Sequence, residues 1–134
     1  MCIRDRGKIE PEASLEEDVT FHDACYVGRH HGEYDAPRDV LQSVLSEKAT
    51  IKEMPRNKQD SFCCGAGGGN MWYEIKQGKR INVERFEEAI ETGVKKVATS
   101  CNFCMIMMED GRKVTGQDEN MEVYDIAELV AERI

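Results

Sequence analysis

Six cysteines are the residues of this chain best suited to chemistry, because thiolates bind metal ions and take part in redox reactions. Two of them are adjacent in the segment SFCCGAGGGNMW, residues 61–72, and run into a stretch rich in glycine. Two others have the spacing Cys-x-x-Cys. The six are Cys2, Cys25, Cys63, Cys64, Cys101 and Cys104. Adjacent cysteines rarely bridge each other because their side chains diverge, so this pattern favours a bound group over a disulfide.

The length, charge and hydropathy of the chain exclude several classes of protein. The 134 residues suffice for one domain with its own core. A net charge of −8 argues against binding to nucleic acid, which requires a basic surface. No stretch approaches the ~18 apolar residues of a membrane span, and the N-terminus lacks the apolar core of a secretion signal. We therefore expect a cytoplasmic protein with reduced cysteines, at the inner face of the membrane only through partners.

The first residues differ from the rest of the chain. Residues 1–18 are polar and acidic, and no hydrophobic periodicity begins before Val19. We interpret residues 1–18 as a disordered linker or an artefactual N-terminus, which sets Cys2 aside. Residues 19–134 form the predicted domain, which we interpret as a fragment of a longer protein.

Strand-like and helix-like patterns alternate through the rest of the chain. Strands are predicted at residues 19–26, 49–55, 94–101 and 121–126. Helices are predicted at residues 36–46, 71–80 with a break around Gly78, 81–93, 102–111 and 125–134. Asp35 and Asn82 are the expected N-caps of two helices, Gly111 is the expected end of another, and Asp125 with Glu128 has capping-box spacing. This alternation predicts an α/β fold with a small parallel sheet flanked by helices.

The cysteines fall where parallel sheets place their sites, at the carboxyl ends of strands. Cys25 ends the first predicted strand, and the pair Cys63 and Cys64 lies in the loop after the second. Cys101 ends the third strand, with Cys104 one turn into the following helix. We therefore expect five thiols that are far apart in sequence to gather at one edge of the sheet.

Several chemistries suit gathered thiols. The Cys-x-x-Cys pair alone fits a redox-active pair, half of a zinc site or part of an iron–sulfur site. A structural zinc takes four ligands, mostly from two spaced pairs, whereas here one pair has no spacer and a fifth cysteine remains. An iron–sulfur cluster accommodates that set better, because its irons are spread in space. Gly65, Gly67 and Gly68 would then let backbone N–H groups approach the inorganic sulfides.

Other interpretations carry less weight. Buried, inert thiols are common in cores, but they do not account for five at the ends of strands. The glycine segment lacks the dinucleotide fingerprint, since Asn70 stands at its third glycine position, and no Walker pattern follows. His22 precedes Cys25 by three residues, and we expect it to hydrogen-bond to the backbone near the site. Trp72 and Tyr73 are candidates to cover the site or to contact a further domain.

Four segments together resemble the cysteine-rich CCG domain of heterodisulfide reductase-like proteins. They are FHDACYVGRHHGEYDAPRDVL, EMPRNKQDSFCCGAGGGNMW, GKRINVERFEEAIETG and VATSCNFCMIMMEDG. The resemblance extends over residues 19–134 and is to the second, C-terminal copy of the domain. The family includes iron–sulfur subunits of glycolate and lactate oxidases and of anaerobic glycerol-3-phosphate dehydrogenase. It also includes membrane-associated proteins that accept electrons from electron-transfer flavoprotein.

The resemblance implies a 4Fe–4S cluster, non-cubane as in heterodisulfide reductase, with these ligands: Cys25, Cys63, Cys64, Cys101 and Cys104. It implies electron transfer within an oxidoreductase complex, with a flavoprotein dehydrogenase or electron-transfer protein and a missing N-terminal half as partners. Two alternatives stay open, a zinc-stabilised structural or interaction module and a thiol–disulfide reductase acting at the cluster. Metal analysis separates zinc from iron, and turnover of a specific disulfide identifies a reductase.

Overall fold

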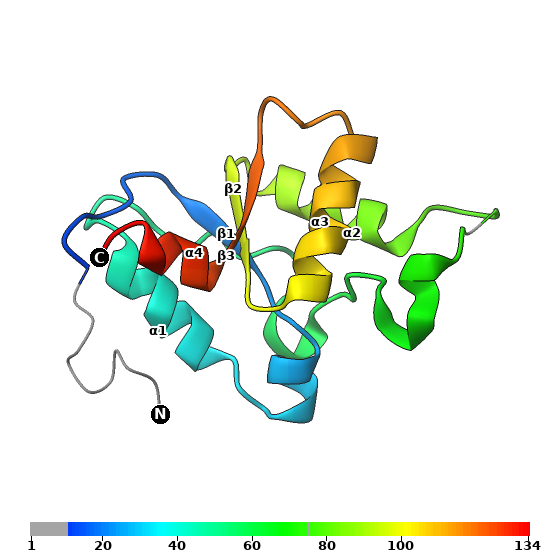
Figure 1. Cartoon of the computed structure of the whole chain (residues 1–134), viewed down its shortest axis with the longest axis horizontal. Coiled ribbons are helices and arrows are strands. Elements are labelled where there is room, and N and C mark those ends of the chain that lie inside the picture. Colours follow the sequence, from blue (N-terminus) through cyan, green and yellow to red (C-terminus); the bar gives the residue numbers. More distant parts are fainter. Residues whose placement is uncertain (1–10, 75) are drawn as a thin grey trace.

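The computed structural model describes residues 11–74 and 76–134, which form a three-stranded parallel sheet (Figure 1). The strands are β1 (Val19–His22), β2 (Lys96–Thr99) and β3 (Glu122–Asp125), in that spatial order. The register pairs the last residues of all three, His22 with Thr99 and Thr99 with Asp125, so the strands end at one level. The predicted α/β fold with a small parallel sheet flanked by helices is confirmed.

Helices cover both faces of this sheet (Figure 1). Among the described residues the α-helices are α1 (Asp35–Val44), α2 (Ile81–Glu91), α3 (Asn102–Val114) and α4 (Ile126–Ala131). α1 and α4 pack on one face, and α2 and α3 on the other. Ala98 of β2 lies in the same core as Leu41 of α1, whereas its neighbour Val97 lies in the same core as Phe86 of α2. Side-chain alternation along a strand covered on both sides accounts for this double burial.

Part of the N-terminal segment packs against the domain. Leu15 lies in the core beside α1, where its N–H donates to the carbonyl of Val44 at 2.8 Å and its carbonyl accepts from the N–H of Ser46. Packing therefore begins before Val19. Cys2 lies outside the described residues.

The predicted strand at residues 49–55 is wrong. Ile51 alone forms a bridge to β1, where the N–H of Val19 donates to the carbonyl of Thr50 and its carbonyl accepts from Lys52. Beyond this bridge Glu53 binds Arg38 through its side chain. The segment is extended, but its pairing with the sheet stops after one residue.

The described part of the predicted helix at residues 71–80 is helical only at Met71 and Trp72, which end a 3-10 helix. A 3-10 helix spans Gly67–Trp72, and no helix follows it until α2 among the described residues. Gly68 and Gly69 have φ angles of 65° and 77°. This left-handed backbone cannot extend a right-handed helix, so it breaks the periodicity that the sequence indicates.

The ends of two helices differ from prediction. Tyr34 and Arg80 are the N-caps of α1 and α2, in place of Asp35 and Asn82. The carboxylate of Glu33 accepts from the N–H of Asp35 and caps α1 from outside the helix. Asn82 lies buried between helices, where its amide donates to the Met107 carbonyl of α3 at 3.1 Å.

Gly111 does not end a helix, because α3 continues to Val114. A Cβ at Gly111 would lie 2.9 Å from both the Asn82 carbonyl oxygen and the Phe86 Cβ, both on α2. Glycine at this position therefore lets α3 approach α2 closely. The capping box of Asp125 and Glu128 is confirmed at the start of α4.

Candidate metal centre

The carboxyl end of the sheet carries three of the five cysteines. Cys25 lies three residues beyond β1, just before a π-helical turn (Tyr26–His30), and is exposed. Cys101 is the N-cap of α3, two residues beyond β2, and Cys104 lies buried in the first turn of α3. Because β1 and β2 pair in parallel, the two chain segments leave the sheet side by side.

The pair Cys63 and Cys64 reaches the same edge along a segment fixed from two sides. The hydroxyl of the buried Ser61 donates to the carbonyl of Asp23 at 3.3 Å. The guanidinium of Arg29 donates to the carbonyl of Ser61. Cys64 is buried at the end of this segment, and Cys63 is half-buried.

The cysteines line two adjoining pockets. The larger one has a volume of about 720 Å³ and is lined by Cys25, Cys64, Cys101 and Cys104. The smaller one is lined by Cys63 together with Cys25, Cys64 and Cys104. The structure thus brings all five thiols to one edge of the sheet, with three of them shared by both pockets.

Gly67 and Gly69 of the glycine segment line the larger pocket, whereas Gly65 and Gly68 do not. Gly65 has a φ of +90°, and its N–H donates to Cys63 Sγ at 3.3 Å. A Cβ at Gly65 would lie 3.1 Å from the Cβ of Ile81, so both conformation and space favour glycine. Gly68 has a φ of +65°, for which glycine is also favoured. Gly67 lines the pocket without a positive φ and with nothing within 4 Å of an added Cβ, so packing within the chain does not explain glycine there.

Crowding makes the buried thiols poor acids. A hydrogen bond with Cys104, together with burial, raises the pKa of Cys64 to about 12. A hydrogen bond with Cys64, together with burial, also raises the pKa of Cys63. Several thiolates at this edge therefore require a cation nearby. A metal ion or cluster would provide that charge and displace the protons, since metal binding is coupled to thiol ionisation.

Ser100 indicates that the site accepts a group that can take a hydrogen bond. Its hydroxyl is buried, has no hydrogen-bond partner among the described residues, and belongs to a residue that lines the larger pocket. A sulfide or a thiolate in the pocket could accept from it. The donor set and this hydroxyl both fit an iron–sulfur cluster.

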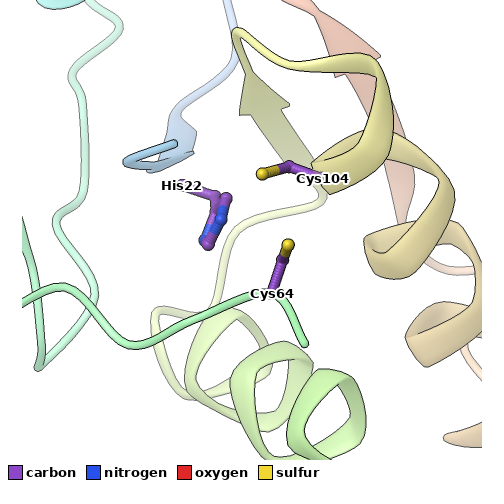
Figure 2. Close-up of side chains that lie close together, drawn as sticks. All are labelled: His22, Cys64 and Cys104. Atoms are coloured by element: carbon purple, nitrogen blue, oxygen red, sulfur yellow. The ribbon is translucent and has the colours of Figure 1, made fainter. Parts of the chain in front are cut away.

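His22 lies against the buried cysteines (Figure 2). A ring nitrogen of His22 and the sulfur atoms of Cys64 and Cys104 lie within 4.8 Å of one another. The ring is buried, and its Nδ1 accepts from Nε of Arg85 at 2.9 Å. Burial and the positive Arg85 lower the pKa of His22 to about 3. The expected hydrogen bond of the imidazole to the backbone is wrong, because the ring pairs with this arginine instead.

Sequence reasoning missed Arg85, whose side chain is fully buried. Its guanidinium also donates to the carbonyl of Arg56 at 2.7 Å and to the carboxylate of Glu88. The helical periodicity could have predicted its burial. The buried face of α2 has the spacing i, i+3, i+4, i+7 and includes Asn82, Arg85, Phe86 and Ala89. An arginine within such a stripe indicates buried acceptors around it.

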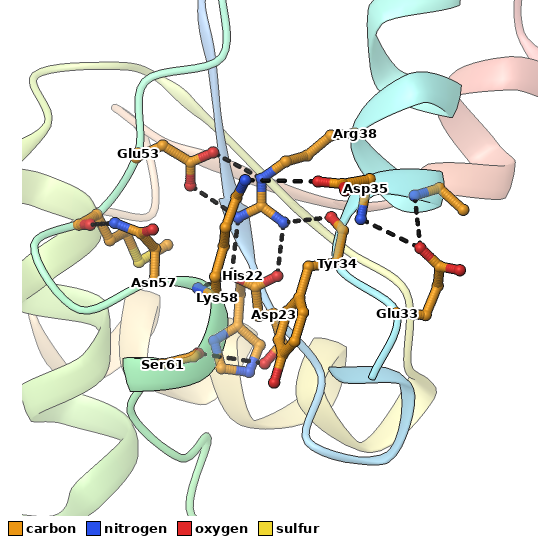
Figure 3. A network of polar contacts seen from close by, with 12 residues as sticks. His22, Asp23, Glu33, Tyr34, Asp35, Arg38, Glu53, Asn57, Lys58 and Ser61 are labelled. Carbon is orange, nitrogen blue, oxygen red and sulfur yellow. Dashed lines mark hydrogen bonds and ion pairs between the residues drawn. The ribbon is translucent and has the colours of Figure 1, made fainter. Parts of the chain in front are cut away.

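A polar network braces this edge from the side of α1 (Figure 3). Arg38 donates to both carboxylate oxygens of Asp23, at 2.7 and 2.8 Å, and to both of Glu53. Asp23 also accepts from the N–H of Lys58 at 2.8 Å. Burial opposes ionisation of Asp23, but the hydrogen bonds from Arg38 and Lys58 bring its pKa below the usual value. The network ties the end of β1 to α1 and to the segment that leads to Cys63.

The opening of the larger pocket is apolar and exposed. Tyr26, Trp72 and Phe103 line it with exposed fractions of 67%, 79% and 58%. Trp72 therefore borders the site, whereas Tyr73 is exposed and does not line this pocket. The rim contrasts with the buried cysteines behind it.

Known proteins are similar to this chain over most of its length. Residues 19–109 match the cysteine-rich domain named CCG. The chain is 39% identical over 128 residues to the probable iron–sulfur-binding oxidoreductase FadF of Bacillus subtilis, covering 96% of this chain and 18% of that protein. It is 39% identical over 131 residues to the EtfAB:quinone oxidoreductase of Syntrophomonas wolfei, covering 92% and 18%.

A third relative comes from an archaeon. The chain is 37% identical over 132 residues to one subunit of the dihydromethanophenazine:CoB–CoM heterodisulfide reductase of Methanosarcina barkeri, covering 95% of this chain and 30% of that protein. The chain thus spans less than a third of the length of these relatives. No helix among the described residues is long and apolar enough to cross a membrane. Because the family match runs from β1 into α3 and takes in all five gathered cysteines, the chain belongs to the CCG family of cysteine-rich domains.

Proposed function

We propose that this chain binds an iron–sulfur cluster, 4Fe–4S and non-cubane, and passes electrons within a heterodisulfide reductase-like oxidoreductase. The observation that carries the proposal is the convergence of five cysteines on two adjoining pockets: Cys25, Cys63, Cys64, Cys101 and Cys104. The names of the relatives, which include an iron–sulfur-binding oxidoreductase and one subunit of a heterodisulfide reductase, support the same class of function.

The five cysteines would hold the cluster as thiolates. Cys64 and Cys104 would bind it from the buried side, and Cys25, Cys63 and Cys101 from the more exposed side. The N-terminus of α3, which Cys101 caps, favours thiolates through its free backbone N–H groups. When bound, such a cluster stores and releases single electrons.

The pocket wall would contribute more than ligands. Without side chains at Gly65, Gly67 and Gly68, the backbone would approach the cluster closely, and its N–H groups would tune the reduction potential. The hydroxyl of Ser100 would donate to a sulfur atom. Met107, which is buried beside the cysteines, would limit the access of water.

Metal analysis of the whole chain tests the proposal. After anaerobic purification and reconstitution with iron and sulfide, we expect about four irons and four sulfides per chain, visible absorption, and an EPR signal on reduction. Cys64→Ser should lower the iron content or change the spectrum. Cys2→Ser, the matched control, should do neither. A Cys64→Ser protein with an unchanged cluster would exclude Cys64 as a ligand.

Two observations favour other candidates. His22, Cys64 and Cys104 have ligand atoms within 4.8 Å of one another, which suits a zinc-stabilised structural or interaction module. One bound zinc and no sulfide would support that alternative.

The larger pocket, about 720 Å³, has room for an organic substrate and favours a thiol–disulfide reductase. Turnover of a disulfide by the reduced protein would distinguish this enzyme from an electron carrier.

The proposed electron partner is a flavoprotein dehydrogenase or an electron-transfer flavoprotein, because one relative is named an EtfAB:quinone oxidoreductase. The relatives are several times longer than this chain, so an N-terminal half is proposed as the second partner. The complex with the flavoprotein would form in the cytoplasm or at the inner face of the membrane. Anaerobic mixing with a reduced flavoprotein tests the electron transfer between them, because the visible absorption of the cluster should bleach as the cluster is reduced.

A further inference from the structure

The imidazole of His22 has one nitrogen whose role is fixed. Its Nδ1 lies 2.9 Å from Nε of Arg85, and a guanidinium has only donors, so Nδ1 accepts and carries no proton. A neutral imidazole has a single N–H, which is then on Nε2. In this tautomer His22 is therefore a hydrogen-bond donor at Nε2.

Arg85 is held in this orientation. Its side chain is fully buried, and its other N–H groups donate to the Arg56 carbonyl at 2.7 Å, to the Glu88 carboxylate and to Ser61 Oγ at 3.4 Å. These acceptors belong to α2 and to the segment that leads to the adjacent cysteines. The guanidinium cannot turn without leaving buried acceptors unpaired, so the ring of His22 is held as well.

The groups beside the imidazole are sulfur atoms. A ring nitrogen lies within 4.8 Å of Sγ of both Cys64 and Cys104, and all three side chains are buried (Figure 2). A hydrogen bond to an ionised acceptor is stronger than a neutral one, and exclusion of water strengthens it further. Once these sulfurs are thiolates, charged acceptors lie beside the ring, and Nε2 is the ring nitrogen that carries the N–H.

Resting on the proposed cluster, we infer that His22 donates a hydrogen bond from Nε2 to a thiolate or sulfide at the buried side of the site, with Arg85 fixing its tautomer. His22 is then a positioning residue that sets the reduction potential. Reduction adds one electron to the cluster, and His22 keeps its proton in both states. Because the added negative charge strengthens the hydrogen bond, the donor stabilises the reduced state and raises the potential.

Two substitutions separate the two nitrogens of His22. In His22→Asn the short amide keeps an acceptor near the position of Nδ1 for Arg85 but does not reach the sulfurs. In His22→Gln the longer amide places an N–H near the position of Nε2. In the reconstituted whole chain, we expect His22→Asn to lower the equilibrium constant for one-electron reduction about tenfold, which is about 59 mV. His22→Gln should restore most of that loss, as measured by a redox titration followed by EPR.

A second measurement uses the unmodified chain and does not depend on how a variant folds. The reduced wild-type cluster should show a coupled proton in pulsed EPR that exchanges in heavy water, and labelling with ¹⁵N-histidine should assign it to a ring N–H. His22→Asn should lose this proton. His30→Asn, at an exposed histidine that contacts Tyr26, is the matched control and should keep both the proton and the potential.

Three results would overturn the inference. A wild-type potential and an unchanged proton coupling in His22→Asn would do so while leaving the cluster established. Equal shifts in His22→Asn and His22→Gln would assign His22 to packing alone. A wild-type chain that binds no cluster would overturn the proposed function, and this inference with it.

Discussion

The two sides of the cysteine pocket are built differently. The inner wall consists of the buried residues His22, Cys64 and Cys104, and Arg85 holds His22 from behind. The outer rim consists of exposed residues: Cys25, Tyr26, Trp72 and Phe103. The side chains of the inner wall pack against other parts of this chain, whereas the large apolar side chains of the rim are exposed to solvent. The chain itself therefore determines the hydrogen bonding at the site, while access to the site depends on the open rim.

Removing the buried cation should have the largest effect on this contrast. Arg85→Met removes the buried one of the two cations that pair with Glu88 and leaves the Arg56 carbonyl without its donor, and breaking such a buried pair costs about 3–5 kcal/mol in the free energy of unfolding. Urea unfolding of the chain without cluster measures it. Arg56→Met also removes a partner of Glu88, but its side chain is 38% exposed, so we expect a loss of only about 1 kcal/mol. Equal losses would mean that the inner wall is no better fixed than the surface.

A smaller loss is expected where the inner wall is tied to α1. In Asp23→Asn the amide can no longer accept both N–H groups of Arg38, and hydrogen bonds to charged groups contribute about 1.5–3 kcal/mol. Thermal unfolding should show a loss in that range. Asp35→Asn is the matched control, because its side chain is 83% exposed and meets Lys58 at 3.4 Å, and it should leave stability unchanged. Similar results for the two variants would show that the network does not hold this edge.

The rim should give the smallest effect. Trp72 is the one tryptophan of the sequence and is 79% exposed, so Trp72→Ser should change the free energy of unfolding by less than about 0.5 kcal/mol. The wild-type fluorescence should be quenched readily by acrylamide. Weak quenching, or a loss of several kcal/mol, would place Trp72 in a packed environment and remove the contrast between rim and inner wall.

The gathering of the cysteines could be predicted because it depends on the order of elements. Cys25 and Cys101 follow parallel strands, and Cys104 follows one turn into a helix, so their common edge results from topology alone. The capping box at Asp125 could be predicted for a similar reason, since its contacts are local. The role of the five cysteines as ligands stays a prediction.

Features that depend on tertiary packing could not be predicted from the sequence. Residues 49–55 alternate like a strand, yet an extended segment has the same pattern when its backbone pairs at Ile51 alone. Helical periodicity at residues 71–80 gave no sign that Gly68 and Gly69 before it adopt a left-handed backbone. Arginine is a residue type that is mostly found on the surface, and only the packing of α2 shows that Arg85 is buried beside His22.

The close contact at Gly111 has a consequence for how the site responds to a change of charge. A Cβ there would lie 2.9 Å from atoms of α2, so α2 and α3 pack in direct contact. Arg85 belongs to one of these helices and Cys104 to the other. With the proposed cluster bound, this close packing would keep the distance between the two residues nearly constant as the cluster gains an electron, and relaxation would fall to the glycine segment and the rim. Such a rigid frame would keep the reorganisation energy of electron transfer low.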